Sequence, residues 1–135
     1  MIKLTHFTIG EKSYAVLYLN TNQVKEGVEC DVYSFVGDST KDLAIVRVKA
    51  GFSTPRQKVM SGAKTIEGFI SGEGNLQIVN DSGEVSDHLF EPGIEASPVE
   101  VSIGDTMQWR AATDFDLSFY EICTPPYEKG RFENL

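Results

Sequence analysis

The sequence predicts a single all-β domain, and three observations support this class of fold. Short segments rich in Val, Ile, Tyr, Phe and Thr recur along the chain, and these residues suit the pleated surface of a sheet. Turn-forming Gly, Asn, Asp and Ser residues separate the segments at short intervals. No segment of useful length has apolar residues at helical spacing. About ten short strands with frequent turns are typical of a sandwich or a barrel.

The N-terminal third of the chain contains four predicted strands, at residues 3–9, 13–19, 30–36 and 43–49. Turn signals at residues 10–12, 20–22 and 37–40 separate them. In the fourth strand, Ala44, Val46 and Val48 alternate with a second set of residues that becomes polar toward Lys49. This alternation predicts a strand with one face that is apolar throughout.

The same pattern of short strand-like segments separated by turn residues continues beyond residue 50. Residues 65–71 and 75–79 flank Gly72-Glu73-Gly74 as the strands of a hairpin flank their turn. We expect a loop over residues 86–98, then strands at 99–103, 106–110 and 117–123. Pro125-Pro126 is expected to end the last strand because proline has no N–H group for a ladder. Residues 127–135 read as a short polar tail.

Length and charge exclude several classes of protein. The 135 residues suit one domain with its own core, and no apolar run approaches the roughly 18 residues of a membrane helix. The start of the chain does not resemble a signal peptide, so we expect a cytoplasmic protein without membrane contact. A net charge of −8 repels phosphate backbones and argues against nucleic acid as a partner.

The two cysteines, Cys30 and Cys123, are far apart and lack the paired spacing of a zinc site. We expect two buried reduced thiols, with a disulfide as the alternative if the chain is secreted.

Three pieces of the sequence resemble the cupin family. Residues 50–55 are similar to the approach to its first motif, residues 69–74 to the strand and glycine turn that close that motif, and residues 101–109 to the Gly-Asp turn that opens its second motif. The resemblance implies a double-stranded β-helix, which is a jelly-roll barrel whose mouth usually holds the ligand. It divides the single domain 1–135 into N-terminal strands (1–41), a cupin motif core (42–127) and a short tail (128–135).

The histidines that form the metal site of the family are not found at the matching positions of this sequence. Its first motif supplies two histidines separated by one residue and then a glutamate, and its second motif supplies another histidine. One register places Gln57, Val59 and Thr65 at the first three positions. Counting back from Glu67 instead places Met60/Gly62 or Ser61/Ala63 at the histidine pair. His6 and His88 lie outside both motifs. Because transition-metal sites need several imidazole or carboxylate ligands, we expect no metal and no other cofactor.

Residues two apart on a strand share a face, so the barrel interior is expected to contain Gln57 and Glu67. A carboxyl group in an apolar cavity would have a raised pKa and could serve as a ligand partner or as a general base. The alternative is that Glu67 pairs with a basic residue (Arg47, Arg56 or Lys58) or faces solvent.

Other candidates for ligand binding are Trp109, Arg56 and Tyr120. Trp109 is expected either to form a pocket wall or to pack in the core. Arg56, with Lys58, could meet an anionic ligand, although solvated charges are the alternative. Tyr120 and Phe119 lie on opposite faces of one strand, so one of them should point inward. His88 beside Asp87 is a further acid–base candidate, in a region that we expect to be a loop.

We therefore expect a metal-independent small cupin that binds a small polar molecule, such as a sugar or an organic acid. One alternative is a metal-free isomerase or lyase that uses Glu67 as base. Another is a non-catalytic structural protein, because strand edges in the N-terminal segment need covering and a homodimer would cover them. Fold alone does not choose among these functions.

Overall fold

The computed structural model describes residues 3–135, where it contains twelve strands and no helix. The strands in chain order are β1 (His6–Ile9), β2 (Lys12–Lys25), β3 (Val28–Phe35), β4 (Asp38–Val48), β5 (Gln57–Val59), β6 (Lys64–Gly72), β7 (Gly74–Val79), β8 (Val85–Phe90), β9 (Val99–Val101), β10 (Thr106–Ala111), β11 (Leu117–Thr124) and β12 (Phe132–Asn134). In this part of the chain nothing has the length and apolarity of a membrane-spanning helix.

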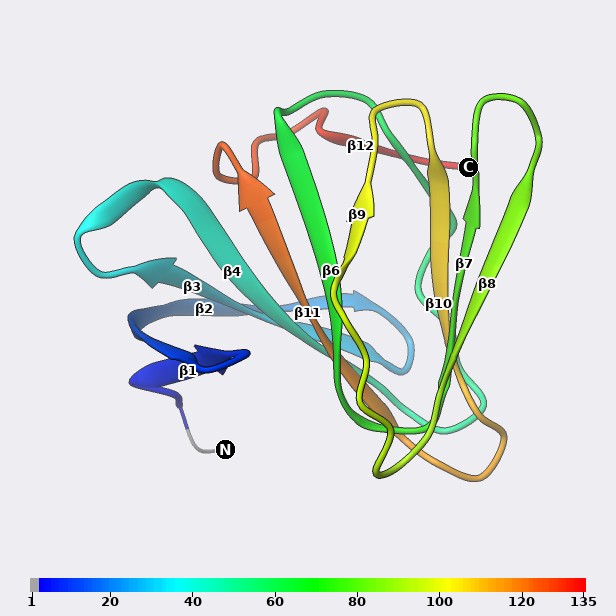
Figure 1. The fold of residues 1–135 in the computed structure, drawn as a ribbon, viewed down its shortest axis with the longest axis horizontal. Coiled ribbons are helices and arrows are strands. Elements are labelled where there is room, and N and C mark those ends of the chain that lie inside the picture. The colour runs from blue at the N-terminus through cyan, green and yellow to red at the C-terminus, as the bar shows by residue number, and fades with distance from the viewer. Residues whose placement is uncertain (1–2) are drawn as a thin grey trace.

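The strands form two antiparallel sheets. The seven-stranded sheet has the order β1-β2-β3-β4-β11-β6-β9, and the five-stranded sheet has the order β12-β5-β10-β7-β8. Strand β11 lies between β4 and β6 although it follows them by many residues, which is the crossing pattern of a jelly roll. Figure 1 shows β7, β8 and β10 standing together beside β6 and β9, while β2, β3 and β4 extend away from them. The all-β prediction is confirmed.

Two separate hydrophobic cores stabilise the sheets. The inner core lies between the two sheets and contains Val46, Val48, Leu76, Met107, Trp109 and Phe119 among its buried members. The outer core lies on the other face of the seven-stranded sheet and is built around Tyr33, Leu43, Ile45, Tyr120 and Ile122. Phe7 of β1 contacts Tyr120 of β11 edge to face, with 5.1 Å between ring centroids. The β1–β2 hairpin therefore curls over the outer face and covers it.

Residues 72–74 connect β6 to β7, but the expected hairpin is wrong, because the two strands do not pair with each other. Strand β6 pairs with β11 and β9 in the seven-stranded sheet, whereas β7 pairs with β10 and β8 in the five-stranded sheet. Gly72 has a φ angle of +91°, and a Cβ atom at this position would lie only 1.9 Å from the carbonyl oxygen of Asp116. A side chain at Gly72 would push β6 away from the segment that leads into β11.

Three elements differ from the sequence prediction. Strand β8 replaces the loop expected over its residues, strand β12 lies in the segment expected to be a polar tail, and β2 continues to Lys25. All three are edge or protruding segments with mostly exposed side chains, so they lack the apolar alternation that identifies a half-buried strand.

Candidate functional site

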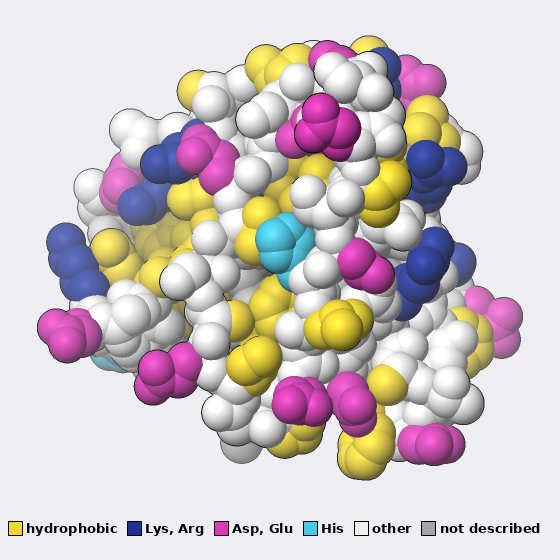
Figure 2. Space-filling view, turned by 45° about the vertical axis from the view of Figure 1, so that its right-hand side comes forward, with side chains coloured by type: hydrophobic (Ala, Val, Ile, Leu, Met, Phe, Trp, Pro, Cys, Tyr) yellow, Lys and Arg dark blue, Asp and Glu magenta, His cyan; other side chains and the backbone are white. Residues whose placement is uncertain are grey.

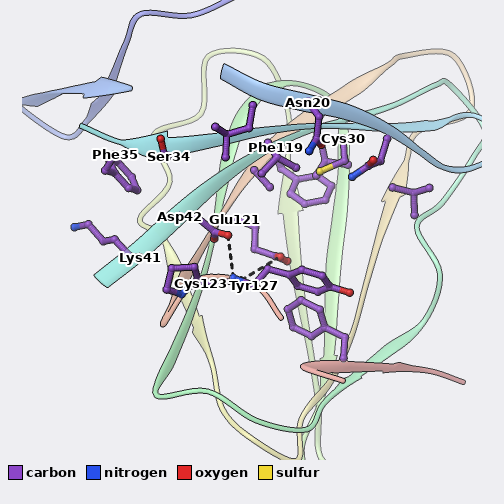
Figure 3. A pocket seen from close by; sticks show the side chains of 18 of the residues that line it. Asn20, Cys30, Ser34, Phe35, Lys41, Asp42, Phe119, Glu121, Cys123 and Tyr127 are labelled. Carbon is purple, nitrogen blue, oxygen red and sulfur yellow. Dashed lines mark hydrogen bonds between the residues drawn. The ribbon is translucent and has the colours of Figure 1, made fainter. Parts of the chain in front are cut away.

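A cavity of about 1020 Å³ opens on the inner face of the seven-stranded sheet. Its walls come from β2, β3, β4 and β11 on one side and from β5, β12 and the segment before β12 on the other. Figure 3 shows Asn20, Cys30, Asp42, Glu121 and Tyr127 around this space. The inner core fills the rest of the barrel, so the cavity is the open end of an otherwise packed interior.

Strand register explains which side chains meet in the cavity. Asn20 of β2, Val32 of β3, Ala44 of β4, Glu121 of β11 and Glu67 of β6 are successive cross-strand partners. They form one row across the inner face of the sheet, because directly opposite residues point to the same side. Val32 and Ala44 are short and leave space in front of the sheet. The row therefore has an amide at one end and two carboxyl groups at the other.

Glu67 lies behind the cavity and is only 1% exposed. Its Oε1 accepts a hydrogen bond of 2.9 Å from the indole Nε1 of Trp109, and its Oε2 has no donor among residues 3–135. No basic side chain in this part of the chain forms an ion pair with Glu67, so the expected alternative with Arg47, Arg56 or Lys58 is not found. Burial raises the pKa of Glu67 well above 4.5, and the nearby Glu121 carboxylate raises it further.

Glu121 is half-buried and lines the cavity beside Glu67. Its Oε1 accepts a weak hydrogen bond of 3.5 Å from the thiol of Cys123. Burial raises the pKa of Glu121, while a hydrogen bond from Glu67 stabilises its charged form. Glu121 was not among the residues predicted from the sequence. The available signal was its place two residues after the inward-facing Phe119, which puts Glu121 on the same face.

Both cysteines line the cavity and both are free. Burial and the charge of Glu121 raise the pKa of Cys30 to about 12, and the same two causes raise the pKa of Cys123. The thiols therefore stay protonated at neutral pH and are poor nucleophiles.

The other residues selected from the sequence lie in different places. Gln57 lines the cavity, and its Nε2 donates a hydrogen bond of 3.0 Å to Oδ1 of Asn134. Trp109 is 2% exposed and stacks on Phe119, with 4.3 Å between ring centroids and 8° between planes. Trp109 therefore belongs to the inner core and does not form a wall of the cavity. Arg56 is exposed and lies outside the cavity lining.

Tyr120 points away from the cavity into the outer core, whereas Phe119 points inward. Gly68, the cross-strand partner of Tyr120 on β6, makes room for the tyrosine ring. A Cβ atom at Gly68 would lie 2.0 Å from the Tyr120 ring, so the tyrosine covers the space that the glycine leaves open. Tyr120 supports the sheet from outside and does not line the ligand space.

The C-terminal segment closes one side of the cavity with Tyr127 and Phe132. The backbone N–H group of Tyr127 donates a hydrogen bond of 2.9 Å to Oδ2 of Asp42. Arg131 is 2% exposed, and its guanidinium donates to the carbonyl oxygens of Pro125 and Lys64 at 2.9 and 2.6 Å and to the hydroxyl of Thr65 at 3.0 Å. This buried arginine fixes the segment against the start of β6.

The residues at the expected metal positions do not fit a metal ion of the cupin type. Gln57, Val59 and Thr65 offer an amide, an apolar side chain and a hydroxyl. Over residues 3–135, no three His, Cys, Asp or Glu side chains come together in a way that could hold a metal ion. His88 lies on β8, which is an edge strand beside β7, and Asp87 accepts a hydrogen bond from Asn75.

The cavity carries more acidic than basic groups. Asp38, Asp42 and Glu121 line it together with one basic residue, Lys41, whose Nζ lies 3.9 Å from a carboxylate oxygen of Asp38. Elsewhere on the molecule, acidic side chains are spread over the face in Figure 2 and are interspersed with apolar and basic ones. The local field of the cavity therefore favours neutral or cationic molecules over anions.

The sequence matches no protein-family model and no curated protein. Solved structures of two other proteins resemble the chain in fold. The capsular polysaccharide assembling protein CapF from Staphylococcus aureus has a TM-score of 0.69 and 14% identity, over 90% of this chain and 34% of its own. The oxalate decarboxylase of Lactobacillus farciminis, in a formate complex, has a TM-score of 0.71 and 17% identity, over 87% of this chain and 33% of its own.

These likenesses define the class of fold. The chain is a double-stranded β-helix, and the architecture is the cupin fold that the motif resemblance implied. The chain spans about a third of the length of these two proteins.

Proposed function

We propose that this chain is a cupin-fold binding protein that holds a small polar molecule in the cavity without a metal ion. The observation that carries the proposal is the cavity of about 1020 Å³, whose amide, hydroxyl and carboxyl groups converge from several strands. Small-molecule sites are concave and combine apolar walls with a few placed polar groups, and this cavity is at the upper end of the usual size range. Phe119, Phe132, Val46 and Ala44 supply the apolar part of the lining.

Charge favours a sugar over an organic acid as the ligand. Carboxylates from Asp42 and Glu121 face the cavity, and Lys41 is already close to Asp38. A ligand carboxylate would meet like charges in a partly desolvated space, whereas hydroxyl groups can donate to both amide oxygens and carboxylates. The names of the two fold neighbours refer to a capsular polysaccharide and to oxalate, so they do not choose between these ligand classes.

Binding is better supported than catalysis by Glu67. This carboxyl group lies behind the cavity lining, and Trp109 already holds one of its oxygens. A base must come within hydrogen-bond reach of the proton that it removes. Glu121, and not Glu67, is the carboxyl group that a molecule in the cavity would touch.

A thermal-shift screen of neutral sugars, polyols and organic acids tests the proposal. We expect neutral hydroxyl compounds to raise the Tm, and we expect Asn20→Ala and Gln57→Ala to reduce that rise because both side chains line the cavity. Arg56→Ala is the matched control because Arg56 is exposed and outside the lining. Larger shifts with organic acids, or shifts that survive both cavity substitutions, would contradict the proposal.

A second candidate is self-association through β2, and a free strand edge favours it. Strand β1 covers the outer edge of β2 only from Lys12 to Ala15. Among residues 3–135, no strand pairs with that edge over residues 17–25. Leu17, Leu19 and Val24 are exposed there, and an unpaired apolar edge is a common template for pairing with another chain. We propose that a second copy of this chain covers it.

A further inference from the structure

Glu67 and Glu121 form a pair of carboxyl groups at one end of the cavity. They are direct cross-strand partners on β6 and β11, and both point to the inner face of the sheet. The Cβ atoms of such partners lie about 4.5–5.5 Å apart, and each carboxyl group acts on the pKa of the other through charge or a side-chain hydrogen bond. Glu67 is 1% exposed, and its Oε2 has no donor among residues 3–135.

Two ionised carboxylates would repel each other strongly in this place. Burial removes the water that would screen them, and two carboxyl groups that share a site keep one proton between them. The indole N–H group of Trp109 makes Oε1 of Glu67 an acceptor. Oε2 is the carboxyl oxygen of Glu67 that is left for a proton, and with that proton in place the pair would hold one negative charge, on the residue that lines the cavity.

The surrounding groups do not neutralise this charge by contact. The guanidinium of Arg131 is directed to carbonyl oxygens and to the Thr65 hydroxyl, and Lys41 lies beside Asp38. Besides burial, Asp42 of β4 raises the pKa of Glu121, whereas the Cys123 thiol and the charge of Arg131 lower it. Burial and then the charge of the pair raise the pKa of Tyr120 on β11 and of Cys30 on β3. Within residues 3–135, no basic side chain forms an ion pair with Glu67 or Glu121.

We propose that the cavity takes a hydroxyl-rich ligand that carries a primary ammonium group, and that this group binds Glu121 while Glu67 keeps the shared proton. The inference rests on the proposed function of this cavity. One ammonium group matches the single charge of the carboxyl pair, and a charged hydrogen bond of this kind is about twice as strong as a neutral one. The amide and hydroxyl side chains of Asn20, Asn22 and Ser34 remain for the ligand hydroxyl groups.

Three compounds with the same ring test the inference: glucosamine, glucose and glucuronate. We expect NMR titrations at neutral pH to give the affinity order glucosamine, glucose, glucuronate, with roughly a tenfold step from glucosamine to glucose. Glu121→Gln should remove the difference in affinity between glucosamine and glucose, while glucose still binds. Glu67→Gln should keep it, because the glutamine amide donates to Glu121 as the protonated carboxyl group does. Glu100→Gln, which removes an exposed charge outside the cavity, should also keep it.

The asymmetry between the two glutamine variants is the decisive result. If Glu67→Gln weakens glucosamine as much as Glu121→Gln does, the pair does not share a proton and the inference is overturned. A carboxyl carbon spectrum of the ligand-free protein that shows both groups ionised at neutral pH overturns it as well. Glucose binding at least as tightly as glucosamine would overturn the inference and leave the proposed function standing, whereas glucuronate binding most tightly would overturn both. If none of the three compounds binds, both the inference and the proposed function lose their support.

Discussion

The Glu67 carboxyl group occupies a place where a charge is unfavourable and a neutral acid is stable. Trp109 supplies one donor, and the inner core excludes water from the rest of the group. An ionised carboxylate with a single donor would be poorly solvated there, whereas the protonated form has a hydrogen-bond acceptor in Glu121. The protonation state of this residue is therefore set by folding, which makes the stability of the protein depend on pH.

Glu67→Gln should remove part of that pH dependence. The unfolded chain loses this proton near the ordinary pKa of 4.5, whereas the folded chain keeps it because burial and then Glu121 raise the pKa. The stabilisation is complete below pH 4.5 and is lost as the pH rises from there through the folded-state pKa. Glutamine has no proton to lose, so the variant should gain free energy of unfolding relative to the wild type as the pH rises.

Urea unfolding at a series of pH values from about 5 to about 8 measures this difference. Glu100→Gln is the control, because it removes an exposed carboxyl group from β9. Stability curves of the wild type and of Glu67→Gln that run parallel over this range would show that Glu67 titrates normally.

The sequence indicated the interior position of Glu67 but not its partner. Alternation along β6 suffices to place Glu67 inside, because residues two apart share a face. Glu121 becomes important only through the pairing of β11 with β6, which brings together residues that are far apart in the chain. Tyr120 and Phe119 could not be assigned to faces from alternation, because the β1–β2 hairpin buries the outer face of β11 as well.

At the scale of elements, the end of the chain is part of the cavity wall because Arg131 holds it there. Strand β12 has only three residues and pairs with β5, which is equally short. A ladder of this length contributes little by itself. The buried guanidinium joins the segment after β11 to the start of β6 through several hydrogen bonds, and Tyr127 and Phe132 are placed by it.

Arg131→Ala should therefore loosen the C-terminal segment more than the rest of the protein. Several buried acceptors would lose their donor, and we expect a loss of stability of about 3 kcal/mol. Hydrogen exchange should accelerate first in residues 125–135. Arg110→Ala is the matched control, since the side chain of Arg110 is exposed and donates to the neighbouring Gln108. Unchanged exchange in residues 125–135 of Arg131→Ala would contradict this role.

Strands β8 and β12 show where prediction from sequence failed at this scale. Only Phe90 of β8 is buried, so its remaining residues follow the composition of a loop. In β12, a single half-buried phenylalanine is followed by two exposed residues. Their strand character comes from backbone pairing with β7 and β5, which the side chains do not reveal. The inner strands were predicted well because a buried face requires regular alternation.

At the scale of the whole molecule, the barrel is divided into a filled end and an open end. Phe69, Phe90, Trp109 and Phe119 stack in succession, with centroid distances of 5.0, 5.3 and 4.3 Å, and fill one part of the interior. The side chains of β3 and β4 that face the cavity are smaller, so the space beside them stays open. The functional site follows from this uneven packing, which requires the fold and the register of every inner strand.

The open end lies beside the free edge of β2, which is the place where a second copy should bind. Residues 17–25 carry no acidic residue in a chain with a net charge of −8, so two such edges can approach without strong repulsion. Pairing of the two edges would extend the seven-stranded sheet and cover Leu17, Leu19 and Val24.

Light scattering during size-exclusion chromatography should give a dimer for the wild type. Leu17→Lys with Leu19→Lys should give a monomer because charged lysines oppose edge pairing. Ile103→Lys, at a position that is 58% exposed away from this edge, should leave the dimer intact. A wild type that stays monomeric at high concentration would rule out this interface and leave the ligand cavity as a property of the single chain.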